Sequence, residues 1–204
     1  MTTEALKDQS PLGDGEERTL TTLVLGVENY DDIIQGRQAA EISKLLVRYY
    51  ENTIPPILRH RGRIDKFIDG AGIHATFGAP APLPNAELAA VQAARSLRRA
   101  IIRFNKIEEN PSFKFRIAVT TGEVSIGNIG NKDRLEYTVV GVPVTLAFRM
   151  LGLARDFATD ILIDENTMRA LGNKVRVAKP RFITVFKSFT DTETESDAFF
   201  PVIG

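Results

Sequence analysis

Two glycine-rich hairpin patterns, one before and one after a long amphipathic helix, most constrain how this 204-residue chain can fold. In the first, the strand-like runs 62–68 and 73–77 are joined by the turn sequence Asp-Gly-Ala-Gly. In the second, the runs 113–121 and 135–140 enclose a polar tip at residues 128–134. Residues 86–107, which lie between the hairpins, carry apolar side chains at helical spacing. We therefore expect antiparallel strand pairs combined with helices.

The other segments complete an alternating order of strands and helices. Residues 19–27 are a short apolar run typical of a buried strand. The next helix is expected to begin at Asp31 and Asp32 and to end before Pro55 and Pro56, and Pro143 opens a later helix through residue 153. Further strands are expected at 158–164, near 175–177, at 181–187 and at 198–202, and a short helix is expected to begin at residue 165. This βαββαβ order with C-terminal extensions predicts a ferredoxin-like α+β sandwich.

The length fits one domain with tails. Residues 1–18 are polar and acidic, and we interpret them as a tail or linker, which leaves residues 19–204 as the domain. Residues 190–197 (TDTETESD) are expected to form a solvated acidic loop.

Composition excludes several function classes. Lys and Arg total 26, as do Asp and Glu, so the chain lacks the basic excess of a nucleic-acid-binding protein. The absence of Cys removes disulfides and thiolate sites, and His60 and His74 alone cannot supply the four ligands of a structural zinc. No apolar run approaches the roughly 18 residues needed to span a membrane. We expect a cytoplasmic protein that binds no nucleic acid.

Three further segments carry a family resemblance. Residues 62–68 (GRIDKFI) are followed by FGAP at 77–80, and residues 116–130 read RIAVTTGEVSIGNIG. Residues 136–141 (EYTVVG) precede a helix that contains Arg149, and ILIDENT follows at 161–167. Together they resemble the class III adenylyl/guanylyl cyclase homology domain over residues 20–167. The resemblance implies a head-to-tail dimer, a homodimer or a pair with another cyclase-type chain, with nucleotide sites between the subunits.

The resemblance also implies a specific chemistry. In such enzymes two Asp residues hold two Mg²⁺ or Mn²⁺ ions, which activate the ribose 3′-hydroxyl and neutralise the pyrophosphate. An Asn and an Arg one helical turn apart steady the ribose and the transferred phosphorus, and a Lys with an Asp or Thr reads the adenine edge.

This sequence departs from that pattern where the chemistry is concentrated. Gly26 and Ala71 stand at the two metal-binding Asp positions, the second after one extra turn residue. Thr145 replaces the ribose-orienting Asn, whereas Arg149 is retained four residues later. The remaining matches are Lys66 and Thr138 at the purine-reading positions and Lys187 at a phosphate-contacting position, together with the apolar Val142 and Phe148 at and near the helix start.

The leading hypothesis is a catalytically degenerate cyclase homology domain, with no cofactor, that acts in regulation, ligand sensing or dimerisation. A small nucleotide is a candidate ligand. The alternative is a low-activity adenylyl cyclase that converts ATP to cyclic AMP and pyrophosphate with relocated carboxylates, Glu28 and Asp69, on Mg²⁺ or Mn²⁺.

Simpler structural roles are also open for these residues. Glu28, Asp31 and Asp32 can cap the following helix, and Asp69 can shape its turn. Lys66 and Arg149 can pair with Asp65 or Glu136, and His74 is expected to be a hydrogen-bonded core residue.

Overall fold

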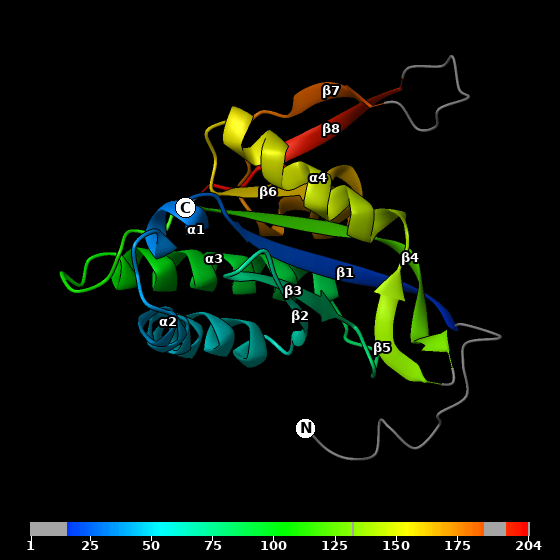
Figure 1. Ribbon diagram of the computed structural model, residues 1–204. Coiled ribbons are helices and arrows are strands. Elements are labelled where there is room, and N and C mark those ends of the chain that lie inside the picture. The colour runs from blue at the N-terminus through cyan, green and yellow to red at the C-terminus, as the bar shows by residue number, and fades with distance from the viewer. Residues whose placement is uncertain (1–15, 132, 186–194, 204) are drawn as a thin grey trace.

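The structure is a computed structural model that describes residues 16–131, 133–185 and 195–203. Within these residues one sheet runs in the order β2-β3-β1-β4-β6-β8-β7, and β5 pairs with the far part of β4 (Figure 1). The strands are β1 Glu16–Val27, β2 Arg63–Ile68, β3 Gly72–Phe77, β4 Phe115–Asn131, β5 Arg134–Val140, β6 Ile161–Asp164, β7 Arg181–Val185 and β8 Glu195–Pro201. β4 and β6 are parallel, and the other paired strands are antiparallel.

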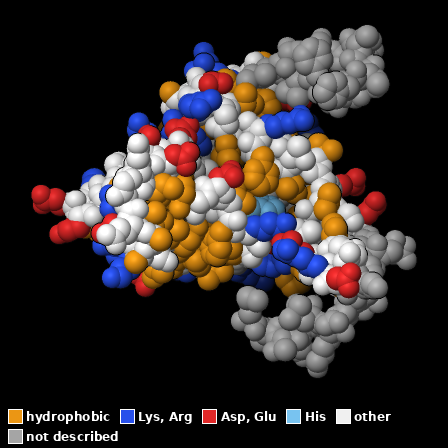
Figure 2. All heavy atoms as spheres, viewed as in Figure 1, with side chains coloured by type: hydrophobic (Ala, Val, Ile, Leu, Met, Phe, Trp, Pro, Cys, Tyr) orange, Lys and Arg blue, Asp and Glu red, His pale blue; other side chains and the backbone are white. Residues whose placement is uncertain are grey.

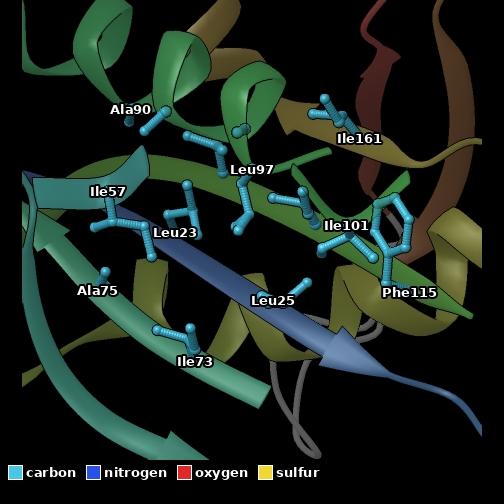
Figure 3. Close-up of a cluster of buried hydrophobic side chains, with 14 of the residues drawn as sticks. Leu23, Leu25, Ile57, Ile73, Ala75, Ala90, Leu97, Ile101, Phe115 and Ile161 are labelled. Carbon is cyan, nitrogen blue, oxygen red and sulfur yellow. The ribbon is translucent and has the colours of Figure 1, made fainter. Parts of the chain in front are cut away.

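Helices cover both faces of the sheet. Their bounds are α1 Tyr30–Ile34, α2 Ala39–Arg59, α3 Ala86–Phe104, α4 Val142–Asp156 and α5 Glu165–Leu171, with a 3₁₀ turn at Gly172–Lys174. Leu23 and Leu25 of β1 face the core beneath α2 and α3, whereas Val24 faces α4, because successive side chains of a strand point to opposite faces. Figure 3 shows the first core, where Leu97 and Ile101 of α3 lie over Leu23 and Leu25. The α+β fold class is therefore confirmed.

The first helical segment begins close to its predicted start, in α1, but it is not continuous and does not end before Pro55. The segment is broken at Gly36, whose φ of +76° is left-handed, so a short α1 precedes α2. Pro55 and Pro56 lie inside α2 instead of following it. The carbonyl groups that lose helical donors belong to the exposed residues Glu51 and Asn52, where water can reach them, and Pro56 is buried in the core.

Both chain ends also differ from the sequence-based boundaries. β1 begins at Glu16, three residues inside the predicted tail, because Glu16 to Arg18 pair with Ile126 to Val124 of β4. The strand expected near 175–177 is a single bridge between Val177 and Val202. Lys187 and most of the predicted acidic loop lie outside the described residues, and the end of that loop belongs to β8. None of the described helices is long and apolar enough to cross a membrane.

Candidate functional site

The end of β1 carries a glycine directly beneath a leucine of α4. Gly26 pairs with Arg116 of β4, and its missing side chain leaves room for Leu151. A Cβ atom at position 26 would lie 2.7 Å from Leu151 Cδ1, closer than real Cβ contacts. The space in which a carboxylate at position 26 would stand is therefore filled by an apolar side chain.

The turn between β2 and β3 is closed in a similar way. Ala71 is fully buried, and a Cβ atom on Gly72 would lie 2.7 Å from Ile68 Cγ1. Ile68 and Leu151 both pack at the border of the hydrophobic cluster under α4. Under the motif assignment, neither metal position carries an oxygen donor, so the side chains there do not fit a two-carboxylate metal site.

The two candidate relocated carboxylates have other surroundings. Glu28 Oε2 lies 3.4 Å from Arg116 Nη2, and α1 has no side-chain cap, so the expected capping role of Glu28 is wrong. Asp69 is exposed with a φ of +42°, and its carbonyl accepts a hydrogen bond from the Ala71 N–H at 3.0 Å. Among the residues that the structure describes, no three His, Asp or Glu side chains gather in a way that could hold a metal ion.

The two purine-reading candidates lie on β2 and β5. Lys66 Nζ is 3.2 Å from Glu136 Oε1, in a pair whose side chains are 41% and 44% exposed. This is one of the two pairings that the sequence left open for Lys66. Thr138 lies two residues further along β5 and pairs with Gly127 of β4. Lys66 therefore already has an anionic neighbour within its own chain.

The N-terminal half of α4 presents the remaining candidates. Thr145 and Arg149 are exposed one turn apart, and the Arg149 guanidinium makes no ion pair or hydrogen bond with any described residue. The pairing considered for Arg149 is therefore not found within the described part of the chain. Val142 is 79% exposed, and the Phe148 ring lies 5.9 Å from that of His74. Figure 2 shows hydrophobic and cationic side chains together on this face of the molecule.

A buried ionic cluster beside Lys66 was not predicted from the sequence. The Asp65 side chain is 1% exposed and forms an ion pair with Arg63. The Arg63 guanidinium carbon also lies over the Tyr137 ring, 4.7 Å from the ring centre. Burial raises the pKa of Asp65 to about 6, although Arg63, Thr76 and Lys66 oppose this increase. The two-residue spacing of Arg63 and Asp65 was the available signal, because residues two apart on a strand lie on the same face, but the spacing did not show that Asp65 would be buried.

His74 belongs to the same cluster. Its side chain is buried as expected, but its Nε2 lies 3.9 Å from Asp65 Oδ2 and makes no hydrogen bond, so that part of the expectation was wrong. Burial lowers the pKa of His74 to about 4, and the cations Lys66 and Arg63 lower it further. His74 is therefore neutral near pH 7.

The fold and this face define a nucleotide-cyclase-like α+β domain. The profile of the adenylate and guanylate cyclase catalytic domain matches residues 16–190, and the chain belongs to that family. Its fold is similar to that of the guanylyl cyclase Cya2, with a TM-score of 0.76, 28% identity and coverage of 93% of this chain and 94% of that one. The adenylyl cyclase CyaB from P. aeruginosa also gives a TM-score of 0.76, at 20% identity, covering 94% of this chain and 96% of that one.

Curated relatives come from mycobacteria. The uncharacterized protein Rv1320c of Mycobacterium tuberculosis is 33% identical over 165 residues, which are 81% of this chain and 28% of that protein. Rv1319c of the same organism is 33% identical over 172 residues, 84% of this chain and 31% of that protein. The chain thus spans less than a third of the length of these relatives.

Proposed function

We propose that this chain is a regulatory binding domain of the cyclase family that does not perform the metal-dependent cyclisation. The observation that carries the proposal is the pair of positions Gly26 and Ala71, where no oxygen donor is present and where Leu151 fills the space above position 26. Two divalent ions would supply both the activated 3′-hydroxyl and the charge neutralisation of the leaving pyrophosphate. The side chains at these two positions cannot hold them.

The residues that remain support binding better than turnover. Arg149 is exposed and available for an anion, whereas Thr145 offers one hydroxyl where an amide would offer both a donor and an acceptor. Retained nucleotide binding would rest on Arg149, Lys66 and backbone amides, would require no metal and would weaken with salt.

The proposed partner is a second copy or another cyclase-type chain. The hairpin of β4 and β5 extends beyond the described part of β1 (Figure 1) and carries the exposed apolar residue Ile129, and α4 exposes Val142 and Phe148. Exposed apolar side chains on these two elements support a protein contact there. A specific dimer would bury at least about 1,000 Å² in total.

The test is an assay of the purified chain with ATP and with GTP in the presence of Mn²⁺, together with calorimetric titration of ATP, GTP and cyclic nucleotides with and without Mn²⁺. We expect product formation at background, and any nucleotide binding to be independent of Mn²⁺. Mn²⁺-dependent formation of cyclic AMP that is lost in Glu28→Ala or Asp69→Ala would establish the relocated-carboxylate adenylyl cyclase instead. Glu123→Ala, which removes an exposed carboxylate of β4, is the control.

A further inference from the structure

The outer part of the β4–β5 hairpin forms no backbone pairing with another described strand of the sheet. We define the outer arm as residues 127–131 and 134–138, where β4 and β5 pair only with each other within the described chain. The described part of β1 begins at Glu16, opposite Ile126, so the described β1–β4 ladder does not include the outer arm. The base of the hairpin is fixed by packing of Val124, Ile126 and Val139 against Leu20. Among the described residues, side chains therefore make the contacts between the outer arm and β2.

Two cationic side chains of β2 make this connection. Arg63 is fixed by the buried Asp65 and stacks on Tyr137, while Lys66 pairs with Glu136. In the first contact, Arg63 is 25% exposed and is paired with the Asp65 carboxylate, which is 1% exposed. Both side chains of the Lys66–Glu136 pair are more than one-third exposed, so a ligand can reach them. An exposed ion pair of this kind is weak and easily replaced by another anion.

We propose that the Lys66–Glu136 pair is a latch that holds the outer arm against β2, and that an anionic ligand opens it by taking Lys66 in place of Glu136. The ligand part of this inference rests on the anion binding in the proposed function, whereas the latch itself does not. Once an anion binds the Lys66 ammonium group, its negative charge repels the Glu136 carboxylate, and Glu136 moves away together with β5. Arg63 and Tyr137 keep the base of the arm in place while the tip becomes more mobile.

The ligand-free test is hydrogen exchange of the outer-arm amides, because local opening sets their exchange rates. Glu136→Gln, which keeps the size of the side chain and removes its charge, should raise outer-arm exchange about two- to fivefold over the unmodified chain. Lys66→Met should give the same increase, and the outer-arm amides of the double variant should exchange no faster than those of either single variant. Glu123→Gln changes an exposed carboxylate on β4 that forms no ion pair with another described residue; it is the matched control and should leave exchange unchanged. Outer-arm exchange in Glu136→Gln equal to that of the unmodified chain would overturn the latch.

The ligand test uses ATP and inorganic triphosphate. Either anion should raise outer-arm exchange in the unmodified chain, should produce no further rise in Glu136→Gln, and should bind that variant about two- to fivefold more tightly. Exchange that stays constant when ATP binds, or weaker binding to Glu136→Gln, would overturn the coupling. Failure of ATP to bind either protein would contradict nucleotide binding in the proposed function and the coupling with it, while the ligand-free comparison would still decide the latch.

Discussion

Leu151 of α4 rests directly on Gly26 of β1, so close that a Cβ atom at position 26 would lie 2.7 Å from Leu151 Cδ1 and the leucine would have to shift. This contact joins the helix to the strand at the edge where the family motifs place a metal carboxylate. This apolar contact belongs to the packing that holds α4 on the sheet.

Gly26→Ala should lower the free energy of unfolding by roughly 1–3 kcal/mol, because the added Cβ overlaps Leu151 Cδ1. Adding Leu151→Ala should remove most of this penalty, since the overlap is then gone, which a double-mutant cycle in urea unfolding measures. Gly152→Ala is the control, because position 152 of α4 is exposed with no atom within 4 Å, and it should stabilise by up to about 1 kcal/mol. Equal stability of Gly26→Ala and the unmodified chain would contradict the close contact.

Restoring metal binding should require space as well as carboxylates. Gly26→Asp with Ala71→Asp is expected to bind Mn²⁺ only when Leu151→Ala is also present, because Leu151 occupies the space above position 26. Thr145→Asn should then be needed for appreciable turnover, since transition-state contacts of this kind are typically worth about 10²–10³ in rate. Deletion of the extra turn residue is a further step, as it displaces position 71. Calorimetric titration with Mn²⁺ measures metal binding by the two-aspartate variant with and without Leu151→Ala. Tight Mn²⁺ binding with Leu151 intact would contradict the prediction.

Arg149→Ala should weaken any nucleotide binding by roughly 1.5–3 kcal/mol, the usual range for a charge-assisted contact. Arg155→Ala serves as the control, because Arg155 is an exposed cation of the same helix with a neighbouring Asp156. Titration calorimetry at two salt concentrations measures both variants. An Mn²⁺-enhanced affinity for ATP that is insensitive to Arg149→Ala would show that the site has been assigned to the wrong residues.

His74 should make the fold more sensitive to acid. Its pKa is lowered to about 4 by burial, whereas a histidine in the unfolded chain titrates near 6.5. The unfolded chain therefore takes up a proton first, and the stability supplied by neutral His74 is present above pH 6.5 and is lost as the pH falls towards 4. Relative to His74→Met, the unmodified chain should lose about 3 kcal/mol across this window.

Urea unfolding of both proteins at several pH values measures this difference. The pKa of Asp65 is raised, so its protonation favours the folded state as the pH falls towards 4, but Asp65 is present in both proteins and largely cancels in the comparison. A constant difference between the two proteins from pH 7 to pH 4 would contradict the assignment.

The arm should contribute to self-association. Ile129→Asp places a charge on the exposed apolar side chain of the arm and should weaken a homodimer, as should removal of residues 128–134. Val47→Asp, on the outer face of α2, is the control for an exposed apolar residue away from the arm. Light scattering at tens of micromolar measures the mass, and a monomer in the unmodified chain at that concentration would contradict a homodimer.

Local patterns predicted most of the secondary structure and failed where packing intervened. The helix signals at Asp31 and before Pro55 are local, yet Gly36 breaks the first and burial of Pro56 carries α2 past the second. The motif around Asp164 was recognisable because its role is local: the Asp164 carboxylate accepts the Thr167 N–H at 3.1 Å and caps α5. Side chains that meet across strands, such as Lys66 and Glu136, were only one of several possible pairings.

The sequence by itself determined the α+β order of elements, the family, and the absence of carboxylates at positions 26 and 71, because each depends on residue type and spacing along the chain. Only the tertiary structure decided that Leu151 fills the space above Gly26, that Arg63 links the buried Asp65 to Tyr137, and that His74 is buried without a hydrogen bond. These relationships join residues far apart in sequence, and their geometry depends on strand register, a bulge in β2 and the seating of α4 on the sheet.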